Sequence, residues 1–295
     1  MYATFFNKNM FVEEHPDMSI SDLYTFVKDG SWTIDKMIEL CRNVYKDENA
    51  NGIADYEDRY GFETIDLHFD CFYIGSDLNF LVKNADGSLA VSDDIGSEKT
   101  IALLEKLCGF FYDSGFAYTK GTTSKESSAV AFSQGRMMFT VDRVYLASGN
   151  TMKDVSDFKY GMLPVPKYNE EQSDYRTCMA FPYTLYSISV KAKDATLECL
   201  ASEGYRRVTP ALFEQSMKTR YSDDVDDSLM YDTIRRAVVI DLGRTFATPL
   251  KNMSCDPFRR TVRENTAAGW KRQVTQMVPL LNSIVKEINT SMAGR

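Results

Sequence analysis

Apolar residues recur at helical spacing along the first half of the chain. One stripe predicts a helix over 34–46 with Thr33 as its N-cap, and a second predicts a helix capped by Ser97. Shorter helices are expected over 21–29 and 124–134, because a glycine follows each of these segments. The two stripes consist of Ile34, Met37, Ile38, Cys41, Val44 and Tyr45, and of Ile101, Leu104, Leu107, Cys108 and Phe111.

Short apolar runs bounded by turn residues predict strands between these helices. The segment 84–87 (Asn-Ala-Asp-Gly) has the composition of a tight turn, so the apolar residues on either side of it are expected to form a hairpin. The prolines within 160–166 favour extended backbone before them. The expected strands are 2–6, 60–62, 137–141, 160–166 and 184–190.

From residue 194 onward the pattern is mainly helical. The Asp-rich segment 222–227 is expected to form a loop between two helices, and Pro279 is expected to break the last helix. The expected helices are 194–206, 209–219, 227–240 and 259–290. Strands and helices alternate early and helices dominate late, so the predicted fold class is α/β and helix-rich.

The charge balance narrows the class of partner. The formal net charge is −8 and the basic residues stand in short pairs, whereas phosphate binding requires a concentrated basic face. Nucleic acid is therefore not an expected partner. The six cysteines stand singly, without the Cys-x-x-Cys spacing of a zinc or redox site. No apolar run approaches the ~18 residues that cross a membrane, and the first residues lack the basic start and apolar stretch of a signal peptide.

The segment 47–58 has the spacing of a calcium-binding loop. Oxygen-bearing side chains stand at its first, third, fifth, ninth and twelfth positions, glycine stands at the sixth, and the seventh can add a carbonyl oxygen. The residues expected to hold the ion are Asp47, Asn49, Asn51, Ile53, Asp55 and Asp58. Because two ligands are Asn and the twelfth is Asp in place of Glu, the site would be weak and structural. The alternative is a solvated turn rich in Asp and Asn.

Catalytic motifs are not found in the sequence. The two histidines, His15 and His68, lack a neighbouring nucleophile in a known motif, and both are interpreted as surface residues. Glycine-rich phosphate loops and the His-Glu-x-x-His zinc motif do not occur. We therefore expect a protein that is not an enzyme.

Several segments, in order, resemble bacterial extracellular solute-binding proteins of the sugar-transporter type, the group that includes maltose-binding protein. Tyr2–Phe11 resembles the family's strand that crosses from the first lobe into the second, and Asp29–Leu40 resembles the Gly-x-Trp-Thr entry to the next helix. The other matching segments are Asp47–Phe62, Phe132–Phe139, Tyr160–Asn169 followed by Gln172 and Tyr175, and then Val208–Glu214 and Lys218–Tyr221.

The resemblance implies an organisation as well as a fold. Residues 1–180 would contain the hinge strand and the second-lobe α/β region, and residues 181–295 the returning hinge and a mainly helical C-terminal region. Members of the family carry an export signal and a first-lobe segment of on the order of 100 residues before the crossing strand, and this chain has neither. We therefore expect a periplasmic-binding-protein-like second lobe with an incomplete first lobe, as a natural truncation or a fragment.

The resemblance also implies candidate ligand-binding residues. The strand over 137–141 should end at the cleft, which places Asp142, Arg143 and Tyr145 there. Tyr183, beside Pro182, is expected near the returning hinge, and Tyr73 on a facing loop. Tyrosine rings stack on sugars, while Arg and Asp bind hydroxyl groups. The alternative for each aromatic residue is packing in the core.

The expected function is that of an extracellular, cell-surface solute-binding component of an ABC importer, for a carbohydrate. It would bind by lobe closure, with permease subunits in the membrane as partners. The alternative is a truncated orphan domain with an interaction or structural role and without transport activity. In that case exposed strand edges would favour a dimer.

Overall fold

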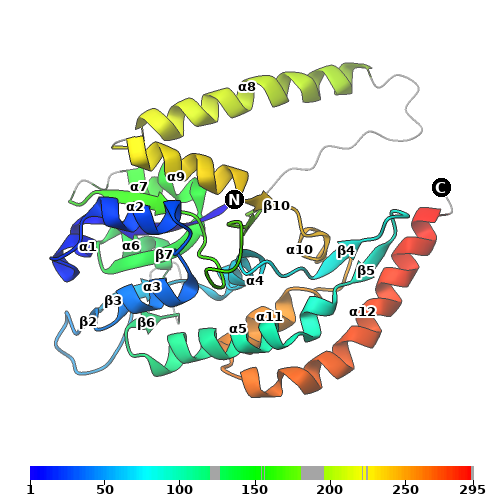
Figure 1. Ribbon diagram of the computed structural model, residues 1–295, viewed down its shortest axis with the longest axis horizontal. Coiled ribbons are helices and arrows are strands. Elements are labelled where there is room, and N and C mark those ends of the chain that lie inside the picture. Colours follow the sequence, from blue (N-terminus) through cyan, green and yellow to red (C-terminus); the bar gives the residue numbers. More distant parts are fainter. Residues whose placement is uncertain are drawn as a thin grey trace.

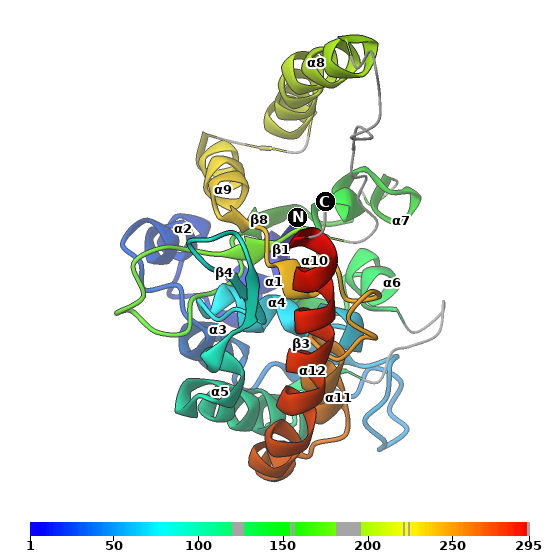
Figure 2. The same cartoon turned by 90° about the vertical axis from the view of Figure 1, so that its right-hand side faces the viewer.

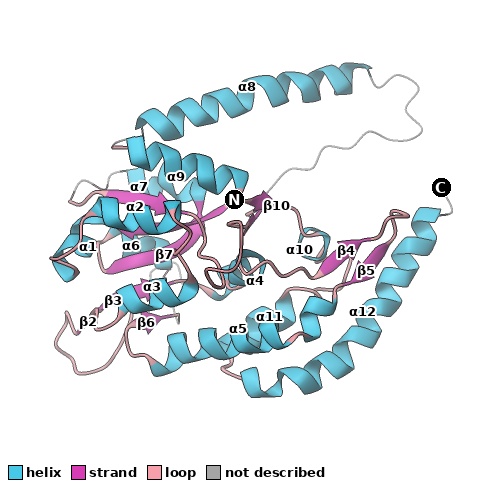
Figure 3. Ribbon diagram, in the orientation of Figure 1, coloured by secondary structure: helices cyan, strands magenta, loops and turns pink. Residues whose placement is uncertain are grey.

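A mixed sheet of six strands forms the centre of the fold (Figures 1 and 3). The computed structural model describes residues 1–119, 127–153, 155, 157–180, 196–220, 222–223 and 225–293. The strands of the sheet are β1 (Tyr2–Asn7), β2 (Tyr45–Lys46), β3 (Arg59–Glu63), β6 (Ala117–Tyr118), β7 (Met137–Arg143) and β8 (Tyr160–Leu163). The main path runs β2-β3-β7-β1-β8, and β6 pairs with β3. The expected strands at 2–6, 60–62 and 137–141 are thus confirmed, and in the segment 160–166 the strand ends at Leu163, before Pro164.

The strand directions place the carboxyl ends of β3, β6 and β7 at one edge of this sheet. β3, β6 and β7 run parallel, whereas β1 runs antiparallel to both β7 and β8. Tyr2 pairs with Arg143 and Ala3 with Asp142, so the start of β1 lies beside the end of β7. In parallel sheets, ligands commonly bind at the edge formed by the carboxyl ends of the strands.

Alternation along β1 explains why the sheet is covered on both faces. Phe6 and Phe5 are both fully buried, and they point to opposite sides. The side of Phe6 belongs to the larger core, which also contains Trp32 and Phe139. The side of Phe5 packs against Phe132 and a smaller core. Trp32 is a core residue, and its indole N–H donates to the carbonyl of Pro164 at 2.9 Å.

The helices surround the sheet and extend beyond it (Figures 1 and 2). Their bounds are α1 (Lys8–Glu14), α2 (Ile20–Lys28), α3 (Ile34–Cys41), α4 (Asp70–Gly75), α5 (Glu98–Cys108), α6 (Ser128–Ser133), α7 (Asn150–Lys153), α8 (Thr196–Arg220), α9 (Val225–Arg236), α10 (Leu242–Thr245), α11 (Asp256–Arg263) and α12 (Trp270–Ala293). α8 lies away from the sheet, beyond α9, in both views.

Two further strand pairs lie outside the central sheet. The predicted hairpin is present as β4 (Leu81–Lys83) and β5 (Leu89–Val91). β9 (Thr177–Cys178) runs parallel to β10 (Val238–Val239). The core continues across residue 180, because Phe258 and Trp270 belong to the same cluster as Trp32. The division of the chain at residue 180 stays a prediction.

Several helix boundaries differ from the sequence prediction. The helix expected over 34–46 ends at Cys41, because Asn43 adopts a positive φ of 66° and turns the chain into β2. The helix expected over 227–240 ends at Arg236, since Val238–Val239 pairs with β9. It also begins earlier than expected: the acidic residues Asp226 and Asp227 occupy its first turn, where the helix dipole favours them, instead of a loop.

The predicted break at Pro279 is also wrong. The two helices expected over 194–206 and 209–219 form one helix, α8, which continues through Pro210. Arg206 is exposed, so water can satisfy its carbonyl group, which has no N–H partner at Pro210. α12 continues through Pro279, which lies on its exposed side, while Met277 and Leu281 are buried and hold the helix against the core. Within the described residues, no helix has the length and apolar character to cross a membrane.

Candidate binding site at the carboxyl edge of the sheet

The last two residues of β7, Asp142 and Arg143, and the nearby Tyr145 lie at the carboxyl edge of the sheet. Asp142 is buried, and its Oδ1 accepts hydrogen bonds from the backbone N–H of Arg143 at 2.6 Å and from the Arg143 Nε at 3.3 Å. Tyr145 lies in the short helix η4 (Val144–Ser148), and 69% of its surface is exposed. A carboxylate, a guanidinium group and an exposed aromatic ring therefore stand within four residues of each other at this edge.

His68 supports Asp142 from the next connection. It ends the short helix η1 (Asp66–His68), and its Nδ1 lies 2.8 Å from the carbonyl oxygen of Val141. Its Nε2 lies 3.8 Å from Asp142 Oδ1. Burial lowers the pKa of His68 below its ordinary value, and this outweighs the opposite effect of Asp142. The expectation that His68 lies at the surface is wrong. Its ring is buried, and the carbonyl of Val141 supplies a hydrogen-bond partner for it there.

A buried ion cluster, formed by Asp70, Arg244, Arg259 and Tyr2, lies next to this edge. We call it the crossing cluster. Asp70 Oδ2 accepts hydrogen bonds from Arg244 Nε and from Arg259 Nη2, each at 2.6 Å. Arg244 also donates to the carbonyl of Met179, and its guanidinium lies 5.3 Å from the ring centroid of Tyr2. The cluster joins β1, α4, α10 and α11 with the segment that follows β9.

The electrostatics of the crossing cluster favour the charged form of Asp70. Burial alone would raise the pKa of this carboxyl group, but Arg244 and Arg259 outweigh burial and hold the pKa below its ordinary value. Burial and the charge of Asp70 raise the pKa of Tyr2, so its phenol stays neutral. An isolated buried carboxylate would be costly, and the two guanidinium groups supply the compensation.

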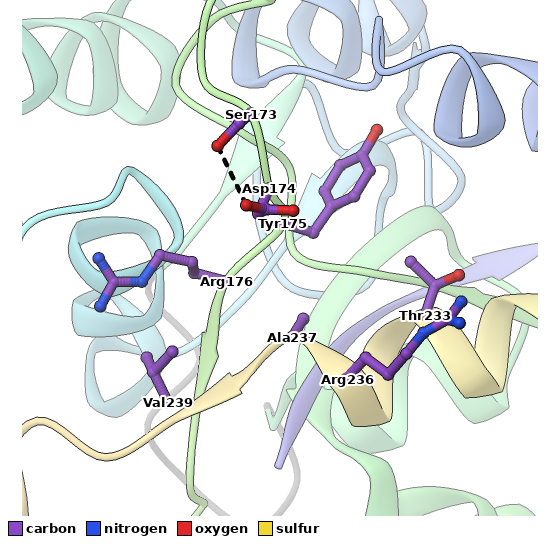
Figure 4. Close-up of a pocket in the computed structure, with 8 residues that line it drawn as sticks. All are labelled: Ser173, Asp174, Tyr175, Arg176, Thr233, Arg236, Ala237 and Val239. Carbon is purple, nitrogen blue, oxygen red and sulfur yellow. Dashed lines mark hydrogen bonds between the residues drawn. The ribbon is translucent and has the colours of Figure 1, made fainter.

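A cleft of about 570 Å³ opens beside β9 and β10 (Figure 4). We call it the return cleft. Its lining residues are Ser173, Asp174, Tyr175, Arg176, Thr233, Arg236, Ala237 and Val239. Arg176 points to one side, where it pairs with Asp77, and Arg236 points to the other side from the end of α9. The volume is in the range of small-molecule sites.

The return cleft is joined to the start of β1 through one residue. Thr177 follows Arg176, and its hydroxyl donates to the carbonyl of Tyr2 at 3.0 Å. Tyr2 is paired in turn with Arg143. The return cleft and the residues at the end of β7 therefore both lie next to the start of β1.

The other predicted ligand residues have different outcomes. Tyr73 is fully buried in α4, its ring stacks on Phe80 at a centroid distance of 4.2 Å, and its hydroxyl donates to the carbonyl of Asn79 at 3.2 Å. The placement of Tyr73 on a facing loop is therefore wrong, because an apolar helix turn packs the ring into the core. Tyr183, Pro182 and the strand expected over 184–190 lie outside the described residues.

Sequence reasoning missed the crossing cluster and most of the return cleft. Asp70, Arg244 and Arg259 come from three segments with no shared motif, so spacing along the chain could not indicate that they meet. Arg236 stood inside the helix expected over 227–240, and only the observed end of α9 places it at the cleft.

The oxygens of the predicted calcium loop serve hydrogen bonds within the loop. Asp47 accepts from the backbone N–H of Asn51 at 3.2 Å and of Gly52 at 2.8 Å. Asp58 accepts from Glu48 at 3.2 Å and from Asp55 at 3.1 Å. Among the residues with a described position, no three His, Cys, Asp or Glu side chains are grouped so as to hold a metal ion. The residue types suit calcium and the contacts suit a turn, so the calcium site stays a prediction.

Comparison with known proteins identifies the fold. No family model and no curated protein sequence matches the chain. Among solved structures, an ABC substrate-binding protein from Listeria monocytogenes in complex with cycloalternan is 11% identical, with a TM-score of 0.56, over 99% of this chain and 69% of that chain. RafE from Streptococcus pneumoniae, in its apo form, is 14% identical, with a TM-score of 0.56, over 95% of this chain and 70% of that chain.

A third similar structure is an ABC transporter solute-binding protein from Thermotoga lettingae bound with alpha-D-tagatose. It is 11% identical, with a TM-score of 0.57, over 96% of this chain and 70% of that chain. The chain therefore has the periplasmic-binding-protein-like fold expected from its sequence. At these identities the likeness establishes the fold, and function requires further argument.

Proposed function

We propose that this chain is an extracellular solute-binding component of an ABC importer and that it binds a carbohydrate without catalysis. The observation that carries the proposal is the fold likeness over 95% to 99% of the chain to such proteins, two of which were solved with a bound sugar. The similar structures are binding proteins by name, which favours a role without bond-breaking chemistry.

The strand-end residues supply the chemistry that sugar recognition requires. The exposed ring of Tyr145 offers a face for the C–H surface of a pyranose, and Asp142 and Arg143 offer an acceptor and donors for hydroxyl groups. A sugar placed there would lie beside the start of β1. From this position it could reach toward the return cleft, which adds polar groups from Asp174 and Arg176.

Binding would act through closure around this edge. The chain crosses the same region three times, in β1, in β9 and in β10, and a hinge formed by a few short segments is a common route to domain closure. A ligand drives closure only if it contacts the closed form better than the open form. The membrane permease would then recognise the closed, loaded form.

Calorimetric titration against a broad panel of mono-, oligo- and cyclic saccharides tests the carbohydrate assignment. We expect at least one sugar to bind with a Kd near 1 μM, which corresponds to about −8 kcal/mol. If no sugar in the panel binds a chain whose circular dichroism shows a folded state, the substrate class is wrong.

The transport partner has a separate test in the gene neighbourhood. We expect genes for membrane permease subunits beside the gene for this chain. A neighbourhood without such genes, together with a chain that binds sugar, would leave the binding role intact and contradict the role in import.

A further inference from the structure

A second cavity lies between the β4–β5 hairpin, α10 and α12. These elements lie side by side in both views (Figures 1 and 2). The cavity has a volume of about 370 Å³. Its walls are apolar, and the residues that form them include Leu81, Leu89, Phe246, Leu250, Ile288 and Met292. Volume and lining are those of a site for a small apolar group.

The walls of this cavity are fixed in place by hydrogen bonds. Asn289 on α12 accepts from the backbone N–H of Leu89 at 2.9 Å and donates to the carbonyl of Leu89 at 2.8 Å. Asp241, the N-cap of α10, accepts from the backbone N–H of Phe80 at 2.8 Å and so ties α10 to the start of the hairpin. The gap between the elements is thus held open by paired polar groups and is not a loosely packed surface.

The rim of the cavity exposes apolar surface and carries one charge. Phe246 and Met292 are 41% and 51% exposed, an unfavourable arrangement for large apolar side chains in water. Lys83 is the charged residue of the lining, and its Cε lies 3.8 Å from the position that a Cβ on Gly87 would take, across the hairpin turn. Among the described residues that line the cavity none is acidic, so Lys83 is the one charged side chain of this described lining.

We propose that this cavity binds a medium-chain aliphatic carboxylate, with the alkyl chain between the hairpin and α12 and the carboxylate at Lys83. An apolar chamber with a single cation at its mouth is complementary to one anionic head and one apolar tail. The nearby carboxylate of Asp86 accepts hydrogen bonds from the N–H and hydroxyl of Ser88, at 2.9 and 2.6 Å, and does not line the cavity.

Calorimetry with decanoate, decanol and decylamine, each below its aggregation concentration, tests this site. Decanoate should bind most tightly, decanol more weakly and decylamine most weakly, because only the first has a head complementary to Lys83. An absence of decanoate binding, or equal affinity for decanoate and decylamine, would overturn the proposal.

Two variants and a control locate the site. Lys83→Met keeps the length of the side chain and should weaken decanoate about threefold to fivefold without changing the affinity for decanol. Leu89→Trp should fill the cavity and remove binding of both probes, with folding checked by thermal melting. Lys271→Met is the matched control, since Lys271 begins α12, roughly 25 Å from Ile288 along the helix axis. A Lys271 variant that weakens decanoate as much as the Lys83 variant does would place the site elsewhere.

Discussion

Arg244 and Asp70 are 174 residues apart in the sequence, yet the Arg244 Nε donates to Asp70 Oδ2 at 2.6 Å in the interior of the protein. Arg259 donates to the same oxygen. One carboxylate therefore ties α4 to both α10 and α11. This contact, as well as apolar packing, therefore holds α10 and α11 in the C-terminal part of the chain against α4.

Replacement of Asp70 by Asn should destabilise the protein strongly. The substitution leaves two buried guanidinium groups without a counter-charge, for which we expect a loss of about 3 to 5 kcal/mol in the free energy of unfolding. Urea denaturation measures this loss. Asp66→Asn is the control, because the ion pair of Asp66 with Arg263 is partly exposed and should contribute less than about 1 kcal/mol. Equal losses in the two variants would show that the crossing cluster adds nothing beyond a surface ion pair.

Acid should remove the contribution of Asp70 to the free energy of unfolding. Because the two guanidinium groups lower the pKa of its carboxyl group in the folded state, its contribution to stability is fully present above the unfolded-state pKa of about 4 and is lost as the pH falls through the folded-state value. The difference in unfolding free energy between the wild type and Asp70→Asn should be constant above about pH 5 and shrink below about pH 4. Denaturation curves across this range decide the matter. A difference that does not change with pH would rule out ionised Asp70 as its source.

His68 should make stability depend on pH in a higher range. Its pKa is lowered by burial, so the unfolded chain binds a proton that the folded chain does not. The free energy of unfolding should therefore fall as the pH drops below about 6.5, and His68→Gln should flatten this slope between pH 7 and pH 5. A His68→Gln variant that keeps the wild-type slope would show that His68 is not the source of this pH dependence.

Tyr145→Ala should weaken binding of the sugar identified by titration about fivefold, because a stacked ring is worth on the order of 1 kcal/mol. Tyr45→Ala is the matched control. Tyr45 pairs with Tyr60, which pairs with Met137 at the start of β7, so Tyr45 lies at the opposite end of the sheet. Calorimetry of both variants separates loss of the site from a general effect. Unchanged affinity in the Tyr145 variant would remove this residue from the binding site.

Calcium should stabilise the loop over 47–58 if the predicted site forms. For a Kd near 1 mM, 10 mM calcium would contribute about 1.4 kcal/mol, or a rise in Tm of about 2 to 4 °C over a chelated sample. Asp47→Asn should reduce this rise. Asp86→Asn, in the turn of the hairpin, should leave it unchanged. A Tm that does not respond to calcium in the wild type would identify the loop as a polar turn.

The elements predicted correctly are those whose burial is local and periodic. The apolar stripe of α5 and the residue pattern of β1 indicate which residues of each element are buried. This information is sufficient to place both elements against a core. Pro279 shows the limit of such reasoning. A proline usually ends a helix, but here its ring faces water while Met277 and Leu281 stay buried, and tertiary packing outweighs the local preference.

The candidate site divides in the same way. Asp142, Arg143 and Tyr145 were predicted because they follow a single recognisable strand. Asp70 and Arg244 were not predicted, because their role depends on a contact between two segments that are distant in the sequence. Tyr73 was misplaced because a tyrosine in an apolar turn packs as readily in a core as on a surface, and only the position of Phe80 decides between the two.

The position of β1 in the sheet has a consequence for synthesis. β1 precedes both of its neighbours in the sheet, β7 and β8, which begin at Met137 and Tyr160. During synthesis, Tyr2–Asn7 therefore lack both partner strands until the chain has been extended through β8, which ends at Leu163. Pairings of such high sequence separation fold slowly and leave apolar strands open to aggregation. Chaperones that shield β1 during this interval are therefore expected to raise the yield of folded protein.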